Sequence, residues 1–178
     1  MRRKINHQVN LKPQDLMIVL KLAVLSGRAT TYSDLAQALG MAASEVHAGV
    51  NRSLLARLIR VEDAAPVVIR AALKEFLLHG AKYAFPATSG AVTRGVPTGY
   101  AAPPLNTRIS QPDEPPPVWP DSHGPLRGIA LYPLYPTAPL AARNDTQLYE
   151  YLALFDAVRG GAARERQIAA QLLAERLS

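Results

Sequence analysis

The chain contains no cysteine, which excludes disulfide bonds and thiolate metal sites. It has no apolar run that approaches the ~20 residues of a membrane-spanning helix. The basic start of the chain is not followed by the apolar stretch of a signal peptide. From these absences we expect a soluble protein of the cytoplasm with one or two small domains and no membrane contact.

The side chains that enzymes use are scattered along the chain. The four histidines lie far apart, and none stands at metal-ligand spacing from another: His7, His47, His79 and His123. No phosphate-binding loop with its lysine, no Gly-x-Ser-x-Gly motif and no dinucleotide-binding glycine pattern is present. We therefore expect no enzyme, and predict no catalytic residue, no metal ligand and no cofactor.

Positive charge is concentrated in the first third of the sequence. Residues 1–61 carry nine Lys/Arg and three Asp/Glu, whereas the remaining residues carry eleven of each. The net charge of +6 thus lies in one segment, as expected if that segment meets phosphate groups. Arg2, Arg3 and Lys4 form a basic arm that could follow a DNA backbone or enter a minor groove, or could be a solvated terminus.

Apolar spacing in this basic segment predicts three helices, over residues 13–25, 33–39 and 43–55. The second and third are joined by a tight turn at Gly40, with Thr31 or Ser33 able to cap the second. This pattern is typical of a helix-turn-helix, and an ordinary helical hairpin is the alternative.

The third predicted helix leaves a face of short or hydrogen-bonding side chains opposite its apolar stripe. Asn51 could pair with adenine, and Arg52 with guanine or phosphate, while His47 could donate to a base or a phosphate. We expect replacement of Asn51 and Arg52 by alanine to abolish sequence preference and leave the fold intact. The full set of predicted DNA-binding residues is Ser33, Ala43, Ser44, His47, Ala48, Asn51, Arg52, Arg57, Arg60 and the basic arm Arg2, Arg3, Lys4.

Residues 13–61 resemble the helix-turn-helix half of winged-helix transcription regulators, broadly the MarR-like and GntR-like class. The resemblance is carried by residues 32–36, by the turn at 39–41 and by residues 44–59. It implies that the helix over 43–55 reads DNA and that a wing contacts phosphate or the minor groove. Residues 58–61 stand where a first wing strand belongs. The chain departs from the class because a helix-like pattern resumes at residue 65, without a clear second strand.

Residues 84–139 have a different character, because they hold thirteen of the fifteen prolines. Such a segment prohibits a continuous helix or a central strand. It is also richer in apolar and aromatic residues than disordered linkers are. We therefore expect an extended segment that packs on a helical body, its own or that of a partner protein, with Trp119 as an anchor. Residues 126–132 are the best strand candidate, and their edge could pair across a dimer.

Two further helices are predicted at the end of the chain, from residue 144 or 145 to about 158 and from 162 to 177. They form a helical hairpin that either completes the core or makes a dimer seam. The predicted fold is mainly α: a basic N-terminal arm (1–12), a winged helix-turn-helix domain (13–83), a Pro-rich irregular or extended arm (84–143) and a C-terminal helical hairpin (144–178).

These features favour a sequence-specific transcription regulator, a repressor that binds double-stranded DNA as a homodimer on a near-palindromic operator. The alternative is a protein-interaction module, such as an antitoxin or assembly factor, in which residues 84–139 wrap a partner protein.

Overall fold

The structure, a computed structural model, describes residues 10–110 and 112–178. Helices account for 54% of the chain and strands for 16%, and the strands form one sheet of two and one of three. The prediction of a mainly α fold is therefore wrong, and the fold is α/β. The predicted basic arm at Arg2, Arg3 and Lys4 lies outside the described residues.

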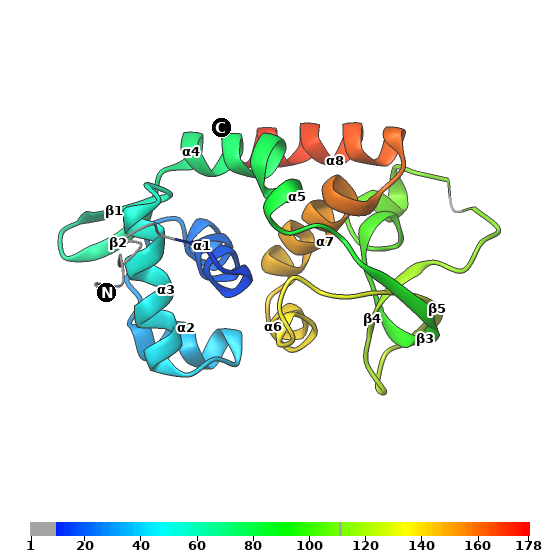
Figure 1. Ribbon diagram of the computed structural model, residues 1–178, viewed down its shortest axis with the longest axis horizontal. Coiled ribbons are helices and arrows are strands. Elements are labelled where there is room, and N and C mark those ends of the chain that lie inside the picture. The colour runs from blue at the N-terminus through cyan, green and yellow to red at the C-terminus, as the bar shows by residue number, and fades with distance from the viewer. Residues whose placement is uncertain (1–9, 111) are drawn as a thin grey trace, which may run out of the picture.

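The first three helices follow the sequence prediction closely (Figure 1). They are α1 (Pro13–Leu25), α2 (Tyr32–Leu39) and α3 (Ala43–Leu55). Thr31 caps α2, since its hydroxyl accepts the Asp34 N–H at 3.1 Å and its own N–H donates to the Asp34 carboxylate at 3.0 Å. Gly40, with φ 63°, ends α2 in the left-handed conformation that glycine adopts most readily.

Helices α1 and α3 pack closely because α3 has a glycine where they cross. A Cβ at Gly49 would lie 2.5 Å from Cδ1 of Ile18 and 2.9 Å from Oδ1 of Asp15. A side chain at this position would displace the Ile18 side chain and the Asp15 carboxylate, so Gly49 allows α3 to pack this closely on α1.

A β-hairpin follows α3. Strands β1 (Ile59–Glu62) and β2 (Ala65–Val68) are antiparallel and are joined by Asp63 and Ala64, whose φ angles are 47° and 64°. Two successive positive φ angles are characteristic of the type I′ turn that matches strand twist. The prediction of a helix from residue 65 is wrong here. A type I′ turn usually carries Asn-Gly or Asp-Gly, and the Asp-Ala pair lacks the glycine that would have indicated it.

One helical segment runs from residue 70 to 84, with a π-helical turn in its middle. Its parts are α4 (Arg70–Glu75), η1 (Phe76–Gly80) and α5 (Ala81–Ala84). Arg70 joins it to two other elements, since its guanidinium donates to the carbonyl of Arg176 at 2.9 Å and to the hydroxyl of Ser26 at 2.8 Å.

The Pro-rich segment folds into a small three-stranded barrel, so the prediction of an irregular or extended arm is wrong. Strand β3 is antiparallel to β4 and β5, which are parallel to each other, and each strand pairs with the other two. The predicted strand at residues 126–132 is confirmed as β5. The elements are β3 (Ser89–Pro97), η2 (Gly99–Ala101), η3 (Leu105–Thr107), β4 (Pro117–Pro120) and β5 (Leu126–Leu131).

No proline stands inside a strand of this barrel: Pro97 ends β3, and Pro117 and Pro120 begin and end β4. Glycine allows the strands to cross. A Cβ at Gly95 would overlap the backbone of Trp119, and a Cβ at Gly128 would overlap the backbone of Pro116. Strand β4 can therefore lie directly against β3 and β5 because Gly95 and Gly128 have no side chain.

Three helices complete the chain: α6 (Ala138–Asn144), α7 (Thr146–Gly160) and α8 (Ala163–Arg176). Asp145 caps α7 by accepting the N–H groups of Gln147 and Leu148, each at 3.0 Å. It also binds Nζ of Lys21 on α1 at 2.6 Å. Helix α7 is buried along most of its length, between the first three helices and the barrel (Figure 1). The helical pair α7 and α8 thus contributes to the core of this chain.

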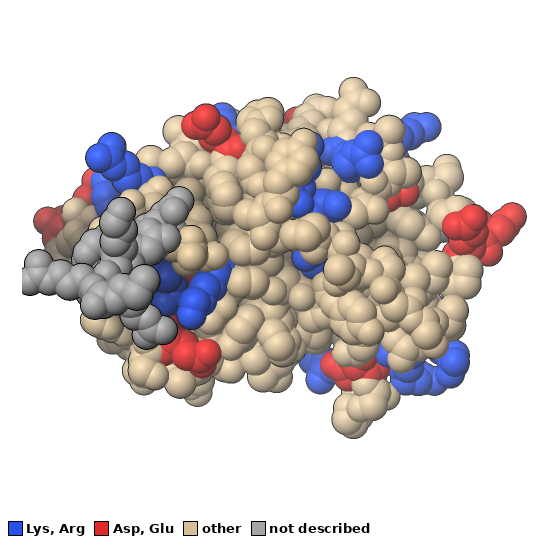
Figure 2. Space-filling model, viewed as in Figure 1, with Lys and Arg blue, Asp and Glu red and all other residues tan. Residues whose placement is uncertain are grey.

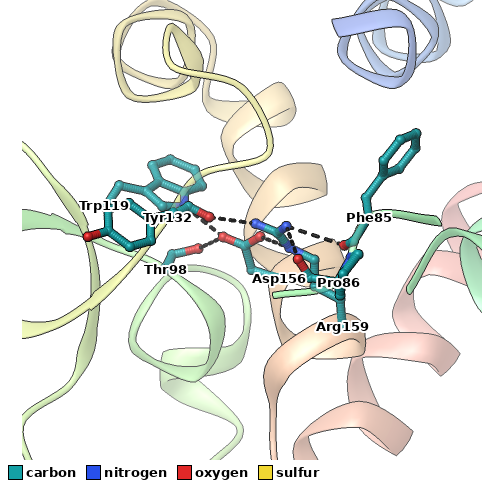
Figure 3. Close-up of polar contacts among 7 residues, drawn as sticks. All are labelled: Phe85, Pro86, Thr98, Trp119, Tyr132, Asp156 and Arg159. Carbon is teal, nitrogen blue, oxygen red and sulfur yellow. Dashed lines mark hydrogen bonds and ion pairs between the residues drawn. The ribbon is translucent and has the colours of Figure 1, made fainter. Parts of the chain in front are cut away.

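A buried carboxylate on α7 holds the barrel (Figure 3). Asp156 is 2% exposed, and its Oδ2 accepts hydrogen bonds from Nε1 of Trp119 at 2.6 Å and from the hydroxyl of Thr98 at 2.7 Å. Its Oδ1 accepts one from Nε of Arg159, one helical turn further on, at 2.8 Å. Trp119 therefore anchors the Pro-rich segment to the chain's own helical body.

Arg159 extends this cluster to the ends of two strands. Its guanidinium donates to the carbonyl oxygens of Tyr132 at 2.8 Å, Phe85 at 3.4 Å and Pro86 at 3.5 Å. Together with Asp156 it holds the chain just before β3 and just after β5.

Within the described part of the chain, no helix has the length and apolar character needed to cross a lipid bilayer.

Replacing Asp156 by asparagine should lower the free energy of unfolding by about 3 kcal/mol, because the buried guanidinium of Arg159 loses its ion-pair partner. Urea unfolding followed by fluorescence of Trp119, the single tryptophan, and by circular dichroism would measure the change. Asp113→Asn removes an exposed carboxylate and is the matched control. Equal unfolding midpoints for the two variants would show that Asp156 does not hold the barrel.

Candidate nucleic-acid interface

Helix α3 presents a row of polar side chains to solvent. Its buried face, which includes Val46 and Val50, packs into the core. Ser44, His47 and Asn51 are exposed and follow one another at spacings of three and four residues, which places them on one side of the helix. Their hydroxyl, imidazole and amide groups can each donate or accept hydrogen bonds at a partner surface.

Two contacts brace the middle of this row. Nδ2 of Asn51 lies 3.3 Å from Nδ1 of His47. The imidazole ring also packs edge-on against the ring of Tyr32, with centroids 5.5 Å apart. Tyr32 begins α2 and is 37% exposed, so it enlarges the exposed surface beside His47. Tyr32 is not among the residues predicted from the sequence, although its position in the first turn of α2 could have indicated it.

Arg52 does not belong to the exposed row, which corrects its predicted position. Its Nε and Nη2 donate to the two carboxylate oxygens of Asp15 at 2.7 and 2.6 Å. Asp15 is fully buried and also accepts the N–H of Lys12 at 2.8 Å. The hydrogen bond to Asp15 raises the pKa of Arg52 above its ordinary value. The guanidinium therefore stabilises the packing of α3 on α1, so alanine at this position should destabilise the fold rather than leave it intact.

The first turn of α3 is acidic. The carboxylate of Glu45 accepts the N–H of Ala42 at 3.0 Å and the hydroxyl of Tyr135 at 3.0 Å. These two hydrogen bonds lower the pKa of Glu45, so it is ionised at neutral pH. A fixed negative charge at this end of α3 would repel an anionic partner, whereas the middle of the helix, around His47 and Asn51, carries no acidic side chain.

The remaining predicted residues surround the row without forming one cluster. Ser33 and Ala43 are exposed in the first turns of α2 and α3, and Ala48 is half-buried beside the row. Arg57 is exposed directly after α3 in a left-handed conformation, with φ 58°. Arg60 on β1 is exposed and pairs with Glu62 at 2.7 Å.

Few of the basic side chains near α3 are available for phosphate contact. Residues 10–68 hold six Lys/Arg and five Asp/Glu, and the two signs are interspersed over this half of the surface in Figure 2. Lys21, Arg52 and Arg60 form ion pairs. Lys12, Arg28 and Arg57 are exposed and have no ion-pair partner within the described ranges. Arg57 follows α3 directly and is the best placed of these three.

No protein-family profile matches this chain, and no curated protein or solved structure is significantly similar to it.

Replacement of Arg52 by alanine should lower the free energy of unfolding by about 3 kcal/mol, since it leaves the buried Asp15 carboxylate without its ion-pair partner. Asn51→Ala, one position earlier on the exposed face, should change it by less than about 0.5 kcal/mol. Thermal and urea unfolding of the two variants would test this difference. If Arg52→Ala were as stable as Asn51→Ala, the ion pair of Arg52 with Asp15 would not be what holds α3 on α1.

Proposed function

We propose that the protein is a sequence-specific DNA-binding transcription regulator in which α3 enters the major groove. The observation that supports this most strongly is the exposed row of Ser44, His47 and Asn51 on a helix held rigidly from below. Asp15 and Arg52 fix α3 on α1. The helix is therefore already ordered before binding, and no conformational entropy is lost in ordering it when a partner binds.

The elements around α3 also support this proposal. Three helices followed by a β-hairpin occur in the same order in winged-helix regulators, such as the MarR-like and GntR-like class, in which the second helix of the turn reads DNA and the hairpin is the wing. Here Asn51 would pair with a base edge, His47 with a base or phosphate, and Arg57 with phosphate. The acidic tip of the hairpin, Glu62 and Asp63, favours a wing that stays off the phosphate backbone.

We further propose a homodimer that acts as a repressor in the cytoplasm. A major-groove helix of this length reads only a few base pairs, and two such helices about one helical turn apart give the usual selectivity of small regulators. Arg2, Arg3 and Lys4 would add phosphate contacts and make the affinity strongly dependent on salt.

Selection from a pool of randomised duplexes, followed by fluorescence anisotropy at physiological salt, tests this function. The enriched duplex should bind at least about tenfold more tightly than a shuffled duplex. Asn51→Ala should reduce this preference by about five- to a hundredfold, because it removes a base contact. Arg57→Ala should weaken both duplexes equally and make the salt dependence less steep.

Asn106→Ala serves as the matched control, since Asn106 is exposed on η3 in the other half of the molecule. It should leave both affinities unchanged. A pool from which no duplex is enriched, or an enriched duplex that Asn51→Ala binds normally, would contradict the assignment of α3 as the reading helix.

A further inference from the structure

The barrel has an exposed outer face with two arginines side by side. In the antiparallel pair of β3 and β5, Arg94 lies directly opposite Arg127, and Val92 lies directly opposite Ile129. These four residues share one face of the ribbon because side chains alternate along each strand. All four are exposed, with Val92 at 51% and Ile129 at 36%. We call this surface the β3–β5 outer face.

The two arginines are not neutralised by the chain. Like charges directly opposite each other destabilise an antiparallel pair. Arg94 donates to the carbonyl of Gly124 at 3.1 Å, and neither arginine has an ion-pair partner among the described residues. The nearby carboxylate of Asp121 is bound by Arg143 instead. Figure 2 shows basic side chains on both sides of an acidic one at the lower edge of the barrel. An anionic group from outside the chain would offset the repulsion between these two arginines.

The same strand has an open edge. Strand β3 pairs with β5 at Ser89 and over residues 92–95, with an irregularity between Ser89 and Val92, but it pairs with β4 only over Gly95–Pro97. The second edge of residues 90–93 therefore lacks a strand partner within the described ranges. An unpaired edge beside an exposed valine is a template for another strand.

We propose that the β3–β5 outer face binds an extended acidic segment of a partner protein, which adds to β3 as a further strand. Its main chain would pair with residues 90–93. Carboxylates on its outer face would accept charge-assisted hydrogen bonds from Arg94 and Arg127. An apolar side chain two residues away would pack on Val92.

Two other occupants fit this face less well. A second copy of the chain, paired antiparallel about a two-fold axis on residues 90–93, would place its neutral Ser89 opposite Arg94 and would bring no carboxylate to the arginines. A nucleic-acid backbone would satisfy the arginines but would use neither the open strand edge nor Val92. The acidic peptide uses all three features. This inference does not depend on DNA binding by α3.

Fluorescence anisotropy of the full chain with a labelled ten-residue peptide of alternating glutamate and valine tests the proposal. A peptide with lysine in place of glutamate, a single-stranded oligonucleotide and a short duplex are the comparison probes. The acidic peptide should bind, and the lysine peptide should bind at least about tenfold more weakly, because it meets two arginines. Hydrogen exchange of the amides at residues 90–93 should slow when the acidic peptide is bound.

Arg94→Gln and Arg127→Gln should each weaken the acidic peptide about fivefold, and Arg108→Gln, which removes an exposed arginine elsewhere, should not. All three are surface changes whose folding Trp119 fluorescence would verify. No binding of the acidic peptide at millimolar concentration, equal binding of the lysine peptide, or unchanged affinity in both arginine variants would overturn the proposal. So would a loss of oligonucleotide binding, rather than peptide binding, in those variants.

Discussion

The buried ion pair of Asp156 and Arg159 is the constraint on which the second half of the molecule depends. The Pro-rich segment cannot form a wide sheet, because proline removes ladder hydrogen bonds. It folds instead as three short strands, whose ends are held by one turn of α7. Five polar groups of that segment meet this ion pair: the carbonyls of residues 85, 86 and 132 and the side chains of Thr98 and Trp119.

A second buried carboxylate has the same role in the first half. Asp15 binds Arg52 and thereby holds α3 on α1, while His47 and Asn51 remain outside. Two polar contacts join the two halves of the molecule. Lys21 on α1 binds Asp145 at the start of α7, and Tyr135, before α6, donates to Glu45 on α3. The position of the exposed row on α3 is thus set by the core below it and by the segment that precedes α6.

Most helices were predictable from sequence, whereas α6, which lies in the predicted Pro-rich arm, and most strands were not. Apolar spacing located α1, α2 and α3 because each has a buried stripe, and Thr31 indicated the start of α2. Strand β3 has two glycines and mostly exposed or half-buried side chains, and β4 has only four residues and begins and ends with proline, so neither shows the alternation that identifies strands. The hairpin turn at Asp63-Ala64 was not predicted because it lacks the glycine that usually indicates such a turn. The position of Arg52 was predicted wrongly because helical spacing indicates which side of the helix a residue lies on but not which side chain it contacts. Its partner Asp15 lies 37 positions away in the sequence.

Contact between the exposed row of α3 and DNA can be measured residue by residue. The most direct measurement is a nuclear magnetic resonance titration of the isotope-labelled full chain with an enriched duplex at physiological salt. Chemical-shift changes should concentrate at Ser44, His47 and Asn51, with Tyr32 beside them, and should leave Arg94 and Arg127 unaffected. Changes confined to the β3–β5 outer face, or absent from α3, would contradict DNA contact by α3.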